Sequence, residues 1–94
     1  MRRKGYIIEA SAIREYAKNG LSPRTQLEGS RLVAHFVNTL QNSTPILGKS
    51  GETLYISKNG TKGVTASEVG YPRHIIKYYR YNEASKLGLL PTEF

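Results

Sequence analysis

Hydrophobic residues recur at helical spacing between residues 32 and 40, and this is the clearest pattern in the chain. The stripe consists of Leu32, Val33, Phe36, Val37 and Leu40. Polar and charged residues occupy the opposite side, so one face is expected in the core and the other in water. Ser22 is a candidate N-cap and Pro23 suits the first helical position, which predicts a helix from there to about Gln41.

A shorter helix is predicted before it. Ser11 is a candidate N-cap for a helix over residues 12–18, because its hydroxyl can accept a hydrogen bond from the unpaired amides of the first turn. Gly20 should end this helix, since glycine adopts the left-handed conformation with the least strain. Upstream, the apolar residues 6–8 are expected to form a short edge strand or a docked extension that follows a basic arm.

From residue 44 onward the alternation changes to a period of two, which indicates strands. Segments 45–47, 53–57 and 63–67 fit this pattern. Between the last two, Asn59-Gly60 favours a type I′ hairpin turn, because both residues readily take positive φ angles. The pattern predicts an antiparallel meander.

Residues 73–81 leave two structures open. The β-branched and aromatic side chains of this segment favour a strand. Pro72 at a first-turn position and Gly88 as a terminator favour a helix instead. We expect the strand, followed by a tail whose leucines pack back onto the body of the domain, because leaving them exposed is unfavourable.

Together these elements predict an α+β domain in which two N-terminal helices pack on a three- or four-stranded antiparallel sheet. The 94 residues of the chain suffice for one small domain with a single core. Its expected parts are a basic arm (1–5), a helical part (11–42), a β-meander (44–81) and a C-terminal tail (82–94).

The chain is strongly basic. It carries 14 lysines and arginines against seven acidic residues, all of them glutamate, and its formal net charge is +7. This excess favours a polyanionic partner, with nucleic acid first and an acidic protein or an anionic membrane surface after it. Seven tyrosines accompany the charge, and a tyrosine ring suits a binding face as well as the rim of a core.

Residues 73–81 combine cations, aromatic rings and a histidine with no acidic residue among them. Lysine and arginine attract phosphates, and exposed tyrosine rings stack on unpaired bases. We therefore predict a nucleic-acid-binding surface that favours RNA or single strands over duplex DNA. Its predicted residues are Arg73, Lys77, Tyr78, Arg80, Tyr81, Lys58, Lys62, Arg2, Arg3 and Lys4. The alternative is that Ile75, Ile76 and some of the tyrosines are core, with the charges on the solvated side of the same element.

If the chain is an enzyme, metal-independent RNA cleavage suits its residues best. That reaction needs a base for the ribose 2′-hydroxyl, a cation for the phosphate and an acid for the leaving oxygen. The candidate catalytic residues are His74, Lys77 and Tyr78. Cations flank His74 along the chain, which favours a neutral imidazole able to accept a proton. His35 becomes a partner only if the sheet closes over the polar face of its helix.

Several classes of site are not expected. The sequence contains no cysteine, which excludes disulfides, thiolate metal sites and cysteine nucleophiles. No zinc or calcium spacing is found, so neither a metal nor a cofactor is expected. No stretch approaches the roughly 20 apolar residues of a membrane-spanning helix, and we expect a cytoplasmic protein without membrane contact. The oligomeric state is left open.

The order of elements is helices followed by an antiparallel meander with a basic, histidine-containing last strand. In this it resembles the small ribonuclease toxin domains of colicins, contact-dependent inhibition systems and toxin–antitoxin pairs. The resemblance covers roughly residues 11–81 and lies in architecture and composition. It implies cleavage of tRNA or mRNA, with no catalytic residue beyond His74, Lys77 and Tyr78. A further possibility is a phage- or plasmid-type inhibitor whose basic face binds a protein partner.

Overall fold

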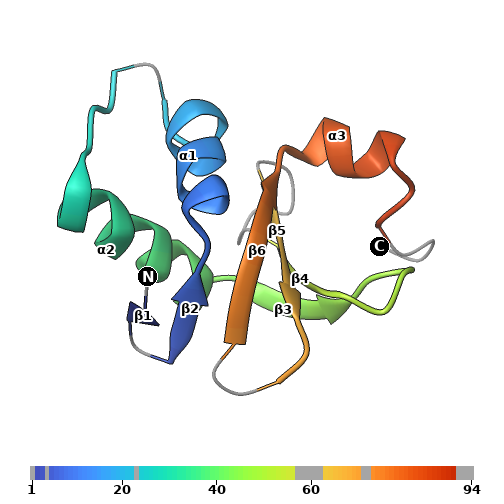
Figure 1. The fold of residues 1–94 in the computed structure, drawn as a ribbon. Helices are drawn as coiled ribbons and strands as arrows, with labels where there is room; N and C mark the ends of the chain where they lie inside the picture. The colour runs from blue at the N-terminus through green and yellow to red at the C-terminus, as the bar shows by residue number, and fades with distance from the viewer. Residues whose placement is uncertain (1, 4, 23, 57–62, 71–72, 91–94) are drawn as a thin grey trace.

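The computed structural model describes residues 2–3, 5–22, 24–56, 63–70 and 73–90, with Arg2 and Arg3 described as backbone only. The helices in these ranges are α1 (Ala10–Asn19), α2 (Gly29–Gln41) and α3 (Tyr81–Lys86). The strands are β1 (Arg2–Arg3), β2 (Tyr6–Ile8), β3 (Thr44–Leu47), β4 (Thr53–Ile56), β5 (Val64–Glu68) and β6 (Arg73–Tyr79). Helices α1 and α2 lie on one side of the sheet and α3 on the other (Figure 1).

The described strands form one mixed sheet in the order β1-β2-β6-β5-β4-β3. Strands β3 to β6 run antiparallel to one another as the predicted meander. Strand β2 pairs with β6 in parallel, so that Tyr6 lies opposite Arg73 and Ile8 opposite Ile75. The α+β class is therefore confirmed, whereas the predicted antiparallel sheet of three or four strands is wrong. The error arises because β2 and β6 are far apart in the sequence, and such a pairing leaves no local pattern.

The N-terminal segment belongs to the sheet. Strand β1 pairs antiparallel with β2, and Gly5 in the connection has a φ of 85°, a conformation that glycine adopts without strain. Residues 6–8, expected to form a short edge strand or a docked extension, lie between two strands instead. The segment expected to be a basic arm therefore contributes an edge strand.

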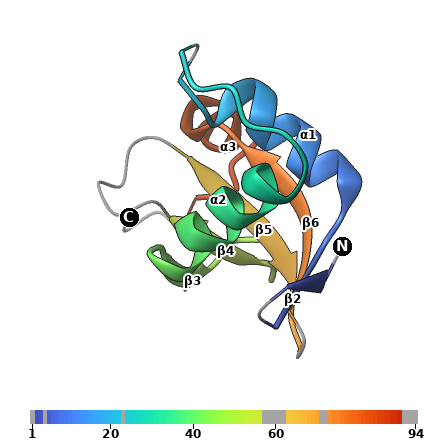
Figure 2. The ribbon, with the colours of Figure 1, turned by 90° about the vertical axis from the view of Figure 1, so that its left-hand side faces the viewer.

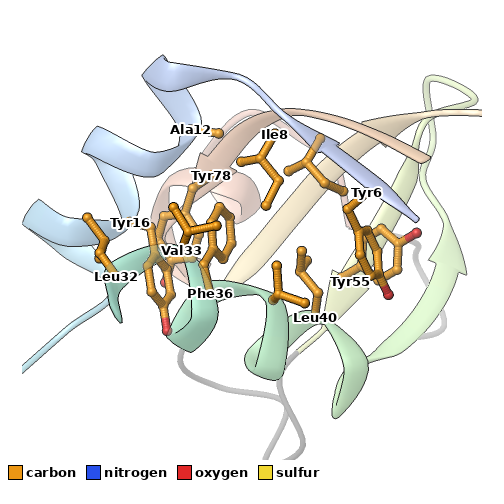
Figure 3. Packing of buried hydrophobic residues seen from close by; sticks show 12 residues of the cluster. Tyr6, Ile8, Ala12, Tyr16, Leu32, Val33, Phe36, Leu40, Tyr55 and Tyr78 are labelled. Carbon is orange, nitrogen blue, oxygen red and sulfur yellow. The ribbon is translucent and has the colours of Figure 1, made fainter. Parts of the chain in front are cut away.

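The main core lies between the sheet and the helices α1 and α2, which Figure 2 shows in front of the sheet. Its residues are Tyr6, Ile8, Ala12, Tyr16, Leu32, Val33, Phe36, Val37, Leu40, Tyr55, Ile75 and Tyr78. The apolar stripe predicted for α2 is buried as expected. Tyr16 of α1 stacks on Phe36 of α2, with ring centroids 4.3 Å apart and planes 10° apart (Figure 3). This stack joins the two helices.

A second buried cluster lies on the opposite face of the sheet. It consists of Leu54, Ile56, Val64, Ala66 and Ala84, with Ile46, Tyr79, Tyr81, Leu89 and Leu90 packed against it. Alternation along β4 explains the two cores, because Tyr55 points to the helices α1 and α2 while its neighbours point to α3. Leu89 and Leu90 cover this face, as expected for the tail, whereas Leu87 stays exposed.

The helix starts differ from the predictions. The Ser22 hydroxyl accepts a hydrogen bond from the amide of Arg24, and the Thr25 amide donates to the Ser22 carbonyl, so this segment closes a turn and does not start a helix. Helix α2 begins at Gly29, whose φ is 56°. Helix α1 begins at Ala10, one residue before the expected cap, because the Glu9 amide is held by the Ile75 carbonyl at the end of β2.

Gly20 follows the end of α1 but does not take the predicted conformation. Its φ is −98°, so the left-handed conformation is not used. A Cβ atom at this position would lie 2.5 Å from the ring of Tyr16, which leaves room for glycine alone. The predicted strand over residues 73–81 is confirmed as far as Tyr79, after which the chain turns into α3. The predicted Asn59-Gly60 turn and the Pro23 position lie outside the described residues.

We expect Phe36→Ala to reduce the free energy of unfolding by about 3–5 kcal/mol, because it removes a fully buried ring and its stack on Tyr16. Urea unfolding followed by circular dichroism measures this change. Val69→Ala is the control: its side chain is 78% exposed, and the expected change is within about 0.5 kcal/mol. Similar losses in the two variants would contradict the assignment of this core.

Candidate nucleic-acid interface

Strand β6 distributes the predicted binding residues over both faces of the sheet. Ala66 pairs with Lys77 and Ser67 with Ile75, so Ile76 is an extra residue that forms a bulge. Ile75 and Tyr78 point into the core under α1 and α2, whereas Tyr79 packs on the opposite face. The predicted binding residues of segment 73–81 are therefore divided between the two faces, and Ile75 and Tyr78 belong to the core, as the alternative interpretation held for Ile75 and some of the tyrosines.

Tyr78 is buried, with 5% of its surface exposed. The edges of its ring meet Tyr16 and Phe36 at centroid distances of 5.3 and 6.3 Å. Its hydroxyl lies so close to Gly63 that a side chain there would clash with it. Burial raises the pKa of Tyr78 to about 12, and the nearby Tyr16 adds to the rise while Arg80 opposes it. The prediction that Tyr78 offers an exposed ring to a base is wrong.

Arg73, the first residue of β6, is exposed and held by two tyrosines. Its guanidinium carbon lies 5.8 Å from the ring centroid of Tyr6 and 6.0 Å from that of Tyr55. Its Nη1 donates a long hydrogen bond of 3.4 Å to the Tyr6 hydroxyl. The Tyr55 oxygen is the largest cause that raises the pKa of Arg73 above its ordinary value. These contacts fix the guanidinium at the surface.

The two tyrosines that hold Arg73 come from distant parts of the chain. Tyr6 lies on β2 and Tyr55 on β4, and their rings meet edge to face at 6.3 Å. Figure 3 shows both hydroxyl oxygens pointing away from the rest of the core cluster. We call Arg73, Tyr6 and Tyr55 the Arg73 cluster. Sequence reasoning selected Arg73 but missed both tyrosines, because only the fold brings them to it.

The other predicted binding residues do not join this cluster. Arg80 lies beyond the opposite end of β6, where it precedes α3. The Lys77 ammonium stands 5.0 Å from the ring centroid of Tyr79, on the face covered in part by α3. Tyr81 is half-buried against that same face. Lys4, Lys58 and Lys62 lie outside the described residues.

The backbone register places Arg3 near the Arg73 cluster. Arg3 pairs with Tyr6 across the β1–β2 hairpin, and Tyr6 pairs with Arg73 on its other side. Arg3, Tyr6 and Arg73 therefore form one row across three strands. Arg2 occupies the next row, opposite Ile7. The backbone positions of Arg2 and Arg3 thus lie at the same end of the sheet as Arg73.

His74 is flanked by carboxylates in the fold. Its Nε2 lies 2.5 Å from Oε1 of Glu9, and its Nδ1 lies 3.9 Å from Oε2 of Glu68. The expectation that cations surround this imidazole is wrong, because strand pairing brings Glu68 opposite His74 and the end of β2 brings Glu9. Both ring nitrogens face acidic groups, so neither is directed at an approaching phosphate.

His35 lies in a network that links α1 to α2. The Tyr16 hydroxyl is 2.7 Å from Nδ1 of His35 and 2.9 Å from Oγ1 of Thr39. Thr39 donates to the His35 carbonyl, so a consistent arrangement has His35 donating to Tyr16 and Tyr16 donating to Thr39. His74 points to the opposite face of the sheet, since its neighbours along β2 and β6 fill the helix-side core. The sheet therefore separates the two histidines, and they do not form an acid–base pair.

The lysines and arginines whose side chains the structure describes have no carboxylate within 4.0 Å among the described residues. The only ion pairs found in those ranges are the two made by His74. The side chains concerned are Arg14, Lys18, Arg24, Arg31, Lys49, Arg73, Lys77, Arg80 and Lys86. All are exposed except the half-buried Lys77. Their charges are therefore available to an external anion.

No family model, curated protein or solved structure matches this chain. The resemblance to ribonuclease toxin domains stays a prediction. Within the described ranges, no three histidine, cysteine or acidic side chains are grouped as a metal site would require. Among the helices described, none has the length and apolar character needed to cross a membrane.

We expect Tyr16→Phe to lower the free energy of unfolding by about 1–2 kcal/mol, because it removes the hydroxyl that joins His35 to Thr39 and keeps the stacked ring. Chemical denaturation measures the loss. Tyr79→Phe serves as the matched control, since Tyr79 is only half-buried. An unchanged midpoint for Tyr16→Phe would mean that the network contributes nothing to stability.

Alkaline pH should destabilise the protein through Tyr78. An unfolded tyrosine loses its proton at about pH 10, whereas folded Tyr78 keeps it until about pH 12. The stability that Tyr78 contributes is therefore complete below about pH 10 and is lost as the pH rises through about 12. We expect Tyr78→Phe to show a shallower fall in unfolding free energy between about pH 9 and about pH 11.5. Parallel pH profiles of the two proteins would refute this origin.

Proposed function

We propose that this chain binds nucleic acid through contacts to its phosphates. The observation that carries the proposal is the absence of carboxylate partners, within the described ranges, for the lysine and arginine side chains. Unpaired exposed cations repel one another and keep a positive potential at the surface. A polyanion relieves that repulsion and releases its own condensed counterions on binding.

The proposed contact region is the end of the sheet that carries the Arg73 cluster. Arg3 and Arg73 lie in one row with a single strand between them, so their Cα atoms are about 10 Å apart. The guanidinium of Arg73 is held by two tyrosines, which reduces the conformational entropy that it loses when it contacts a phosphate. These features support Arg73 as the central contact.

The proposed mode of binding differs from base stacking. Four of the described tyrosines are buried: Tyr6, Tyr16, Tyr55 and Tyr78. Tyr79 and Tyr81 are half-buried and pack against the second core cluster. Phosphate contacts do not depend on sequence, so they set affinity and salt dependence without selecting bases. The affinities for single-stranded RNA, single-stranded DNA and duplex DNA must therefore be measured side by side.

Ribonuclease activity receives less support than binding. For His74 to cleave RNA, one of its ring nitrogens must reach the 2′-hydroxyl or the leaving oxygen. Glu9 and Glu68 occupy both sides of His74, and their charges repel the phosphate that such a reaction must approach. Tyr78, the other candidate proton donor, is buried.

Fluorescence anisotropy with labelled strands at several salt concentrations tests the proposal. We expect the logarithm of the affinity to fall linearly with the logarithm of the salt concentration. Arg73→Ala should reduce this slope by about 0.7 for a single strand, or about 0.9 for duplex DNA, as one phosphate contact is lost. Arg80→Ala is the matched control, because it removes the same side chain at the other end of β6.

The outcomes separate the proposal from its rivals. Absence of binding to all three nucleic acids, or an affinity independent of salt, would contradict it and would favour a protein partner. If Arg73→Ala and Arg80→Ala reduce the salt slope equally, the assignment of the contact region to the Arg73 end of the sheet is contradicted. Fragments of the labelled RNA in the presence of EDTA would favour the ribonuclease alternative.

A further inference from the structure

The Arg73 cluster carries hydrogen-bond donors for which the described residues supply no matching acceptor. Arg73 donates to the Tyr6 oxygen, so the hydrogen of that hydroxyl points elsewhere. Within the described ranges the structure shows no acceptor for the phenolic hydrogen of Tyr6 or of Tyr55, and no carboxylate for the guanidinium. A cation and two phenolic donors that meet at the surface suit an anion with several oxygens.

The strength of these donors follows from their neighbours. A phenolic oxygen that lies against a guanidinium is polarised, so its hydrogen becomes a better donor to an incoming anion. The rings of Tyr6 and Tyr55 are almost completely buried and therefore cannot move away from Arg73. The cluster is thus organised before any ligand arrives, and binding costs little ordering of side chains.

We infer that the Arg73 cluster binds the terminal phosphate monoester of a nucleic-acid strand. This inference rests on the proposed function and names the part of the nucleic acid that the cluster receives. An internal phosphodiester offers two non-bridging oxygens, whereas a monoester offers three and carries more negative charge near neutral pH. Arg73 can bind two oxygens side by side through its guanidinium, and a phenolic hydrogen then serves the third.

Strands of one sequence that carry a 5′-phosphate, a 3′-phosphate or neither test this inference by fluorescence anisotropy. We expect one of the phosphorylated strands to bind about tenfold more tightly than the unmodified strand, as one additional charge-assisted contact forms. Tyr55→Phe and Tyr6→Phe, which keep the rings, should each reduce that preference. Tyr79→Phe, on the other face of the sheet, should keep it.

Each of the other possible results contradicts a different part of the inference. If all three strands bind equally and with steep salt dependence, the terminal phosphate plays no part, while the proposed function stands. If the nucleoside monophosphate alone competes as well as the phosphorylated strand, the ligand is a free nucleotide. If the preference survives in both phenylalanine variants, and urea unfolding shows them folded, the site lies elsewhere. Failure of every strand to bind removes the proposed function as well.

Discussion

Strand β2 pairs in parallel with β6, and the Arg73 cluster depends on this pairing. It joins residues 67 positions apart in the sequence and brings Tyr6 beside Arg73. The Arg73 amide donates to the Gly5 carbonyl, and the Glu9 amide donates to the Ile75 carbonyl. The pairing is therefore fixed at both ends. It also turns the chain directly into α1, whose Tyr16 then stacks on α2.

Most of the described tyrosines of the sheet are core residues. The sequence suggested instead that tyrosines would be exposed for stacking on bases. Tyr6, Tyr55 and Tyr78 fill the space under α1 and α2 with large rings, and the hydroxyl oxygens of Tyr6 and Tyr55 point away from the rest of the core cluster. Most of the described lysine and arginine side chains, in contrast, stay at the surface. The carboxylates of Glu9 and Glu68 lie beside His74, while the described lysine and arginine side chains have no carboxylate within 4.0 Å among the described residues. The result is a core rich in aromatic rings beneath a basic surface.

Local patterns in the sequence predicted those structural features that depend on residues close together in the chain. The apolar stripe of α2 and the meander strands follow from periodicity within a few residues. The strand that begins at Arg73 follows from its β-branched and aromatic side chains. The helix start at Ser22 was wrong because a serine side chain closes a turn as readily as it caps a helix. The parallel partner of β6 could not be predicted, since pairing over such a distance depends on the whole core.

The same distinction applies to the candidate site. Arg73 was selected for its charge, but its two tyrosines were not, because they come from β2 and β4. His74 was judged by its cationic sequence neighbours, whereas cross-strand pairing decides its surroundings. Arg73 therefore links site and fold in both directions. Its backbone amide donates a hydrogen bond to the Gly5 carbonyl, and its guanidinium donates one to the Tyr6 hydroxyl. An anion held by Arg73 and Tyr6 together binds only when β2 lies beside β6, so it stabilises the pairing that creates its site.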